Sequence, residues 1–461
     1  MHSPCFHAPR RQRGAVAIMV ALSMLVLLGA VGLAIDAGLA YMVKARLNAA
    51  VDSAALAGAR AVTSGASQAD QVASAQAASA RFFAANIPST YLSSKPNLLG
   101  TTVTFNAGTA TIDVRAEAPM PVSFMQVMGF TSLNPVAYAQ TIRKDLDMAL
   151  VVDTSGSLSS SATAVRAAAK TFLSKFNVLQ DRIGMVHFAY GAEVDNPIRT
   201  GARGFDLTAM QGNIDNLTFG GSTASVEGMW NARNQLNLIP LASRSSLRVI
   251  VFFSDGVPNA IGSSLTFNDG SNCAPGVVDS SGQGMLSLTD SQGSYLSNSG
   301  CQTSLTYWGY YFPWYYVSKL PAYYNAHNNL QEFPIVTGAP RPVTADLSST
   351  AVTFPDGTRS TVGGRNVDRA ARNLAEAVAA KARDEGVYVF TLGLGSDLKI
   401  KSGADNEVGE DVLKCMANVA DGPSRCYNAA KPAGMYCYAA TTADLTPCFS
   451  RLASAILRIS K

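Results

Sequence analysis

The chain has 461 residues, of which 48% are hydrophobic, so it is long enough for two or three domains with sizeable buried cores. Its 36 basic and 32 acidic residues leave a formal net charge of +4. Charges this evenly balanced do not indicate the basic surface of a nucleic-acid-binding protein, and we expect no nucleic acid partner.

The N-terminal segment predicts a membrane anchor. A basic flank, residues 10–13, precedes an uncharged apolar run from Gly14 to Ile35, which as a helix is about 33 Å long at roughly 1.5 Å per residue. Such a helix can cross a bilayer core of about 30 Å, and the flank keeps residues 1–13 in the cytoplasm. A cleaved signal peptide, with residues 38–40 as its cleavage site, is the alternative, but the run is longer than a usual signal h-region.

The cysteines are consistent with export. Cys5 precedes the apolar run, and six others follow it, namely Cys273, Cys301, Cys415, Cys426, Cys437 and Cys448. Zinc sites need closely spaced pairs, so an even number of well-separated cysteines on the oxidising side favours disulfides. We expect Cys273 to pair with Cys301, whereas the last four allow three connectivities that the sequence does not separate.

Residues 36–143 predict a small α+β stalk domain. An alanine-rich segment, 36–62, has apolar residues near the helical period and predicts a helix that continues out of the membrane, extended by the polar stretch 64–80. Residues 101–120 then alternate apolar and polar side chains around a turn at 106–108, as in a β-hairpin. No cluster of catalytic residue types occurs in this domain.

Three features of this N-terminal third occur together. They are the motif R-x-R-G-x-x-A-I before the apolar span, the alanine-rich helix with Asp36 and Tyr41, and a β region ending in "VAYAQTIRK". Together they resemble the TadE/TadG-like, pseudopilin-related proteins of the bacterial tight-adherence (Flp pilus) machinery. The resemblance implies an inner-membrane anchor, with the bulk of the chain in the periplasm or at the cell surface. Type IV prepilins carry Glu five residues after the processed Gly, whereas Met19 stands there in this chain, which argues against cleavage by a prepilin peptidase.

From residue 144 the pattern changes to alternating strands and helices. Apolar strands are predicted at 147–152, 182–189, 247–254 and 387–394, and helices at 162–178, 225–238, 366–385 and 445–459. Fully apolar strands separated by helices are typical of a parallel sheet covered on both faces. Residues 144–461 therefore predict a doubly wound, mostly parallel α/β fold, whose ligands bind at the carboxyl ends of the strands.

Oxygen-bearing side chains follow two of these strands and precede one helix. Asp153, Ser155 and Ser157 follow the first strand, Thr223 lies in a glycine-containing loop before a helix, and Asp255 follows the strand 247–254. With 247–254 as the fourth strand of a sheet of order 3-2-1-4-5, that strand is the neighbour of the first, so the five side chains should converge. Three hydroxyls and two carboxylates suit Mg²⁺, Mn²⁺ or Ca²⁺ and match zinc poorly. A turn that only caps the next helix is the alternative for the first three.

The pattern D-x-S-x-S with a distant Thr and a distant Asp resembles the von Willebrand factor type A domain and its metal-ion-dependent adhesion site. The resemblance implies that Ser155 and Ser157 bind the metal directly and that Thr223 binds it directly or through water. It implies that Asp153 and Asp255 act mostly through water. An acidic group of a protein partner would then complete the coordination.

A Ser-, Gly- and Asn-rich insertion interrupts this domain at about 257–364. Its aromatic cluster, Tyr307–Tyr316, is either the core of a disulfide-pinned subdomain, which we favour, or a contact surface. Because the insertion starts directly after Asp255, we expect it to overhang the metal face. His187 lies within a predicted strand and is expected to be a core or edge histidine.

These patterns favour a membrane-anchored, metal-dependent adhesion or assembly component of a tight-adherence pilus or a related secretion apparatus. Its expected partner is a protein of that apparatus. A surface adhesin for host or matrix ligands is the second hypothesis. A metal-dependent hydrolase is the third, but no general base or base-paired nucleophile lies near the predicted site, and we expect the chain not to be an enzyme.

Overall fold

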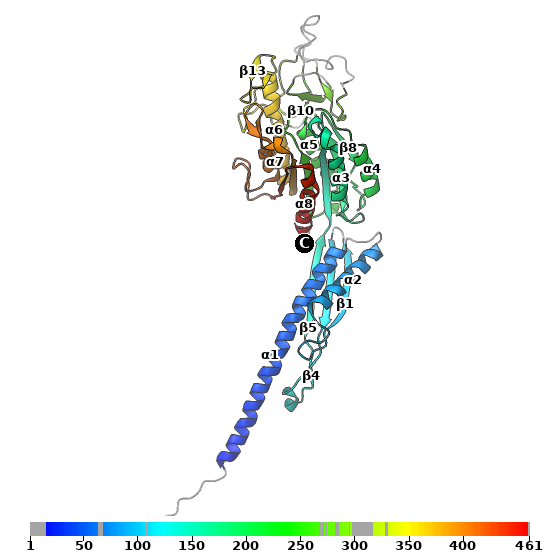
Figure 1. Cartoon of the computed structure of the whole chain (residues 1–461), viewed down its shortest axis with the longest axis vertical. Coiled ribbons are helices and arrows are strands. Elements are labelled where there is room, and N and C mark those ends of the chain that lie inside the picture. The colour runs from blue at the N-terminus through cyan, green and yellow to red at the C-terminus, as the bar shows by residue number, and fades with distance from the viewer. Residues whose placement is uncertain are drawn as a thin grey trace, which may run out of the picture. The chain divides into compact units, whose positions relative to one another are not determined.

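The computed structural model describes residues 15–62, 68–106, 109–266, 272, 274–281, 285–294, 296, 317–327 and 331–459 (Figure 1). The chain divides into two compact units, Met1–Asn106 with Ala110–Arg143, and Lys144–Lys461 with Ala107–Thr109. Cys5, Cys273, Cys301 and the aromatic cluster lie outside the described residues, so the roles expected of them stay predictions.

The first unit is built on one long helix, α1 (Ala15–Ala61). By length and composition its apolar N-terminal part could cross a membrane, and its large side chains there are exposed. From Val43 onward α1 buries an apolar face against α2 (Gln68–Asn86). The expected extension of the first helix through residues 64–80 is wrong, since α2 is a separate helix. Ser64 and Gly65, between the two, are poor helix formers.

A three-stranded sheet completes the first unit, with β2 (Thr109–Glu117) between β1 (Asn97–Asn106) and β5 (Val136–Lys144). Alternate residues of β2 are buried, as the alternating sequence predicts: Ala110, Ile112, Val114 and Ala116. Between β2 and β5 the chain forms β3 (Met120–Pro121), a 3-10 turn η1 (Met125–Met128) and β4 (Ser132–Leu133).

The second unit contains a six-stranded sheet of order β18-β15-β9-β6-β7-β8. The strands are β6 (Leu146–Asp153), β7 (Arg182–Phe188), β8 (Ala192–Asn196), β9 (Leu247–Ser254), β15 (Val387–Leu394) and β18 (Tyr436–Ala439). Every pairing is parallel except that of β7 with β8. All residues of β6, β7 and β9 are buried, because helices cover both faces of the sheet.

One face packs against α3 (Ala162–Leu173), α4 (Leu207–Asn216) and α8 (Leu445–Ile459), and the other against α5 (Ser225–Leu238), α6 (Val362–Asp384) and α7 (Gly409–Ala417). The predicted α/β fold with a mostly parallel sheet is thus confirmed. Two helix ends differ from expectation. Helix α3 ends at Leu173 instead of residue 178, and α6 begins at Val362, where the Thr361 side chain accepts a hydrogen bond from the Gly364 amide and caps the helix.

The insertion after β9 adds small antiparallel elements to the second unit. They are β10 (Ala260–Ser263), β11 (Gly276–Asp279), β12 (Leu286–Ser287), β13 (Ala351–Thr353) and β14 (Arg359–Thr361), and β16 (Lys401–Ser402) pairs with β17 (Glu407–Val408) further on. Ile261, Val277 and Ile335 of the insertion are buried in the same core as α5 and α6. The described part of the insertion is therefore continuous with the main core and has no separate core of its own.

Two disulfides close short loops near the C-terminus. Cys415 is bonded to Cys426, and Cys437 to Cys448. Of the three pairings that the sequence allows, the structure has the one between sequence neighbours.

Candidate metal centre

The candidate site lies where β6 and β9 end side by side. Asp153 is the last residue of β6 and is fully buried. Its Oδ1 accepts a hydrogen bond from the Ser155 amide at 2.7 Å, and its Oδ2 accepts one from Ser254 Oγ at 2.5 Å. The carboxyl of Asp153 therefore holds the turn after its own strand and the end of the neighbouring strand together.

The turn after β6 brings its hydroxyls to the carboxyl group that follows β9. Ser157 Oγ donates to Asp255 Oδ1 at 2.8 Å, and the Oγ atoms of Ser155 and Ser157 are 3.3 Å apart. Four of the five predicted residues are thus joined by a chain of hydrogen bonds, although Asp255 is 98 residues from Ser157 in the sequence.

Thr223 reaches the same place from the loop before α5. Backbone hydrogen bonds from Gly156 to Gly221 at 3.0 Å and from Gly220 to Thr154 at 2.8 Å hold this loop against the turn. A Cβ atom at Gly256 would lie 3.3 Å from Thr223 Oγ1 and 4.0 Å from Ser157 Oγ, so these two hydroxyls face the same glycine. The structure therefore brings all five predicted residues together.

The two carboxyl groups at this site have raised pKa values. Burial raises the pKa of Asp153 to about 6, although hydrogen bonds from Ser155 and Ser254 work against it. Burial, and then the charge of Asp153, raise the pKa of Asp255 to about 7. Among the described residues no Lys, Arg or His forms an ion pair with either group.

This donor set fits a hard divalent cation. Uncompensated carboxyl charge beside hydroxyl oxygens is the environment that Mg²⁺, Mn²⁺ or Ca²⁺ stabilises. No group of three or more His, Cys, Asp or Glu side chains suited to a metal occurs in the described part of the chain. The candidate centre has two carboxyls and three hydroxyls, so it depends on serine and threonine oxygens. Its role in binding a metal stays a prediction.

Three supporting residues were not anticipated. Ser254 fixes Asp153, and the Asn259 side chain accepts a hydrogen bond from the Thr223 amide at 2.8 Å. The charge of Asp397, in the turn η5 (Ser396–Lys399) after β15, also raises the pKa of Asp255. Ser254 is the last residue of β9, and Asn259 and Asp397 come after the carboxyl ends of β9 and β15, so their position at this edge of the sheet was the available signal.

Described segments of the insertion contact the Thr223 loop. Ser222 Oγ donates to Asp279 Oδ2 at 3.0 Å, and Gln292 Nε2 donates to the Thr218 carbonyl at 3.4 Å. The insertion therefore lies beside the loop that carries one of the five candidate side chains.

His187 takes part in a hydrogen-bonded chain of Asp195, His187 and Ser291, with both nitrogen-to-oxygen distances at 2.8 Å. This connectivity is that of a hydrolytic triad, but Ser291 is only 1% exposed and its Oγ also lies 2.9 Å from Glu193 Oε1. A nucleophile must reach its substrate, so the arrangement is that of a buried polar cluster, as expected for a core or edge histidine.

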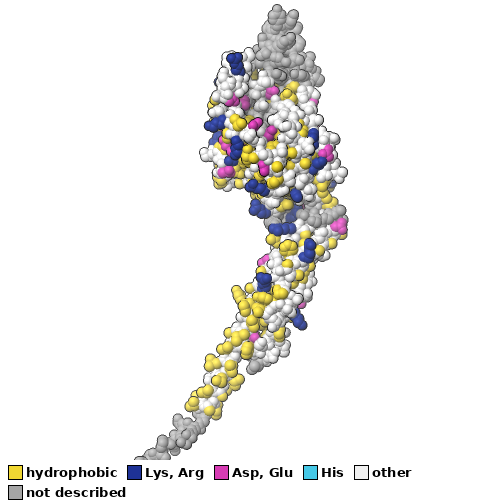
Figure 2. Space-filling view, viewed as in Figure 1, with side chains coloured by type: hydrophobic (Ala, Val, Ile, Leu, Met, Phe, Trp, Pro, Cys, Tyr) yellow, Lys and Arg dark blue, Asp and Glu magenta, His cyan; other side chains and the backbone are white. Residues whose placement is uncertain are grey.

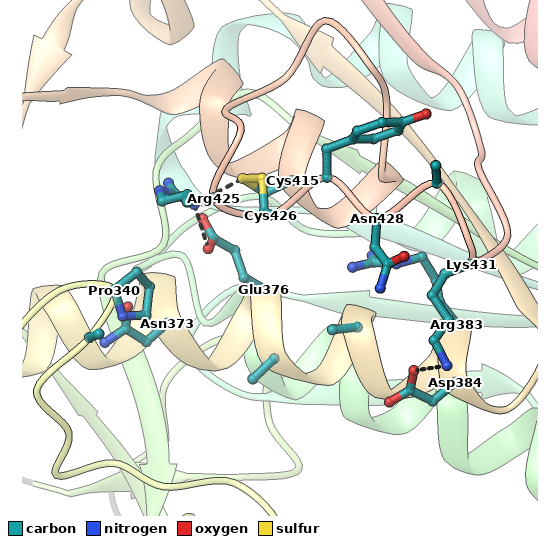
Figure 3. A pocket seen from close by; sticks show the side chains of 15 residues that line it. Pro340, Asn373, Glu376, Arg383, Asp384, Cys415, Arg425, Cys426, Asn428 and Lys431 are labelled. Atoms are coloured by element: carbon teal, nitrogen blue, oxygen red, sulfur yellow. Dashed lines mark hydrogen bonds and ion pairs between the residues drawn. A yellow bond between two sulfur atoms is a disulfide. The ribbon is translucent and has the colours of Figure 1, made fainter.

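A separate groove of about 1060 Å³ lies between α6 and the loop closed by the Cys415–Cys426 disulfide (Figure 3). Glu376, Arg425 and Arg383 are among the side chains that line it, and Arg425 bonds both Glu376 Oε2 and Cys415 Sγ at 2.9 Å. None of the five candidate metal ligands lines this groove.

Two family models match the sequence. Residues 14–61 match the Flp pilus-assembly TadE/G-like family, and residues 148–257 match the von Willebrand factor type A domain. Both resemblances noted in the sequence are thereby confirmed. No curated protein matches the chain.

Solved structures from pili resemble the fold loosely. The pilus adhesin SpaC from Lactobacillus rhamnosus GG is 14% identical over 81% of this chain and 34% of that one, with a TM-score of 0.37. The PilB minor pilin from Streptococcus sanguinis is 13% identical, with 80% and 79% covered and a TM-score of 0.36. The von Willebrand factor domain of the type V pili tip protein Mfa5 from Porphyromonas gingivalis is 18% identical, with 70% and 98% covered and a TM-score of 0.36. The chain spans about a third of the length of SpaC.

Proposed function

We propose that this protein is a membrane-anchored component of a tight-adherence (Flp) pilus or related secretion apparatus, and that it binds a protein partner through a divalent cation held at the candidate metal centre. The pilus assignment is supported by a TadE/G-like segment and a von Willebrand factor type A segment in one chain. The observation that carries the cation is the meeting of three hydroxyls with two carboxyls that have no described ion-pair partner.

In this proposal Ser155, Ser157 and Thr223 present the hydroxyl oxygens that hold the cation. Asp153 is fully buried and already accepts two hydrogen bonds, so it orients the turn and supplies charge from behind. Asp255 orients Ser157 in the same way. The bound cation would supply a positive charge with a coordination position open to an acidic group of the partner.

We further propose that the apolar part of α1 anchors the protein in the bacterial inner membrane, with the second unit in the periplasm or at the cell surface. The apolar composition of α1 and the two disulfides of the second unit support this placement.

Calorimetric titration of the full chain in detergent with Mg²⁺ and Mn²⁺ tests the metal centre. The wild type should bind one ion, and Asp153→Ala should not bind it, because the turn loses its anchor and its charge. Asp405→Ala is the matched control, since Asp405 is paired with Arg369, which is none of the five candidate residues. Undiminished binding by Asp153→Ala would rule out this site.

The biological role is tested by complementing a deletion strain. Thr223→Ala removes one hydroxyl and should weaken binding by about 1 to 3 kcal/mol, roughly a five- to hundredfold loss of affinity, while the fold is retained. Surface adherence should fall with Thr223→Ala and Asp153→Ala while protein levels hold. Full adherence from both variants would show that the pilus function does not use the metal centre.

A further inference from the structure

The segment Met120–Leu133, here called the 120–133 loop, is fastened to α1 at the end of the apolar run. The carboxylate of Asp36, only 1% exposed, accepts hydrogen bonds from three consecutive backbone amides. They are those of Ser123 at 3.1 Å, Phe124 at 2.8 Å and Met125 at 2.7 Å. Asp36 therefore satisfies the free amides at the start of η1 and fixes the loop at one height along α1.

Gly32 brings the loop further along the helix, into the apolar run. A Cβ atom at Gly32 would lie 2.4 Å from the Cβ of Phe124, whereas one at Gly29 or Gly38 would meet nothing within 4 Å. Gly32 lies four residues before Asp36, which is about 6 Å along a helix. Phe124 therefore lies beside the last turn of the segment that is apolar enough to cross a membrane.

The loop is apolar and uncharged where it meets α1. Residues 118–142 contain no Asp, Glu, Lys or Arg. Phe124 and Phe130 are each 50% exposed. The loop and α1 also enclose an apolar groove whose lining includes Leu33, Ala37 and Met125. In Figure 2 hydrophobic side chains cover much of the visible surface of α1.

We propose that the 120–133 loop is a second membrane-contact element, and that Phe124 and Phe130 insert among the phospholipids of the non-cytoplasmic leaflet beside α1. This inference rests on the membrane anchor of the proposed function. An exposed apolar surface of this kind marks a site of contact with a membrane or another protein. A loop fixed beside the end of a membrane-spanning helix lies at the depth where the acyl chains begin, so the contact that we propose is with lipid. Two contacts with the bilayer then fix both the depth and the rotation of α1.

Depth-dependent fluorescence quenching of the full chain in vesicles tests this placement. The probes are Phe124→Trp and Phe130→Trp, in phosphatidylcholine and phosphatidylglycerol vesicles with bromine either near the headgroup or near the acyl chain end. The three native tryptophans contribute a background that is subtracted with the wild type. Both probes should lose emission with bromine near the headgroup, as expected for side chains at the interface.

Two further variants are controls on the same helix. Leu25→Trp, in the middle of the apolar run, should be quenched by bromine near the chain end. Leu56→Trp, 20 residues beyond Asp36 and so about 30 Å away, should be quenched by neither lipid. Unquenched probes at 124 and 130 with a quenched Leu25→Trp would overturn the loop proposal and leave the surface for a protein partner. An unquenched Leu25→Trp would overturn the anchor, and the loop proposal with it.

A glycine pair tests whether the contact with α1 positions the loop. Gly32→Ala places a Cβ against Phe124, so it should reduce the quenching of the Phe124→Trp probe. Gly29→Ala, where the added Cβ has open space, should leave that quenching unchanged. Equal quenching in the two backgrounds would contradict the placement of Phe124 beside Gly32.

Discussion

The second unit buries carboxyl groups in two places, and the pKa values of these groups are shifted in opposite directions. At the candidate metal centre burial, followed by the charge of Asp153, raises the pKa of Asp255 to about 7. Glu407 accepts a hydrogen bond from Arg425, which lines the groove of Figure 3, and burial also acts to raise the pKa of Glu407. There, however, hydrogen bonds and charges from Arg341 and Arg425 outweigh burial and lower that pKa to about 2.

The two places differ in whether the chain supplies basic side chains as partners for the buried carboxyl groups. Arg341 donates to both oxygens of Glu407, at 2.7 and 2.9 Å, and to Glu376 at 2.8 Å. This network joins the insertion, α6 and β17, so its opposite charges stabilise the fold. At the candidate metal centre no described basic side chain plays that part, and the uncompensated charge is a cost to stability that a cation can offset.

The largest expected effect comes from breaking the arginine network. Arg341→Leu leaves Glu376 and Glu407 without their main partner, and should lower the free energy of unfolding by about 3 to 5 kcal/mol. Arg369→Leu breaks the more exposed pair with Asp405 and should cost about 1 kcal/mol or less. Urea unfolding of the full chain in detergent, followed by tryptophan fluorescence, measures both. Equal losses would mean that burial does not distinguish the two pairs.

The same network predicts a pH dependence. The folded-state pKa of Glu407, about 2, lies below its ordinary value of 4.5, so ionisation stabilises the fold. This contribution, on the order of 2 kcal/mol, is fully present above about pH 4.5 and is lost as the pH falls toward 2. Glu407→Gln should therefore be less stable than the wild type near pH 6, and the gap should narrow as the pH is lowered. A gap that stays constant would assign the loss to packing instead of charge.

At the candidate metal centre, removing a carboxyl charge should change the metal-free stability in the opposite direction, toward a more stable fold. Asp255→Asn keeps an acceptor for Ser157 but removes a repelled charge, so at about pH 8 it should raise the metal-free stability by about 1 to 3 kcal/mol. It should also lose the stabilisation by Mg²⁺ that the proposed site predicts for the wild type, about 2.7 kcal/mol at 100 times the dissociation constant. Thermal unfolding with Mg²⁺ and with a chelator measures both effects. A variant that is destabilised without metal would remove the contrast between the two places.

The smallest expected effect concerns Ser254. Ser254→Ala deletes the hydrogen bond to Asp153 Oδ2 without replacing any of the five candidate residues, and should weaken Mg²⁺ binding by about 1 kcal/mol, roughly fivefold. Calorimetric titration against the wild type is the measurement. An affinity equal to that of the wild type would show that Asp153 needs no support from β9.

Local sequence patterns were sufficient for the central elements. Two strands, Leu247–Ser254 and Val387–Leu394, and two helices, Ser225–Leu238 and Leu445–Ile459, have the bounds that their apolar runs and breaks predict. The meeting of the five candidate residues could also be anticipated, because it needs only the strand order and the rule that parallel strands end at one edge.

Contacts between segments that are distant in the sequence could not be predicted from those local patterns. The edge strand β8 is mostly half-buried and polar, so it lacks the apolar signal of the central strands. Arg341 and Glu407 are 66 residues apart, and no periodicity predicts that they meet. The pairing of the last four cysteines likewise depends on where α7 and β18 lie in the fold.

The link between Thr223 and Asn259 has a mechanical consequence. The Thr223 amide donates to the Asn259 side chain at 2.8 Å, and the Asn259 amide donates to the Thr223 carbonyl at 3.1 Å. The next residue, Ala260, begins β10, so if a partner binds at the Thr223 loop as proposed, tension on that loop would pass through two hydrogen bonds into the insertion. The two hydrogen bonds would divide the load between them, so the insertion would carry part of the force together with the central sheet.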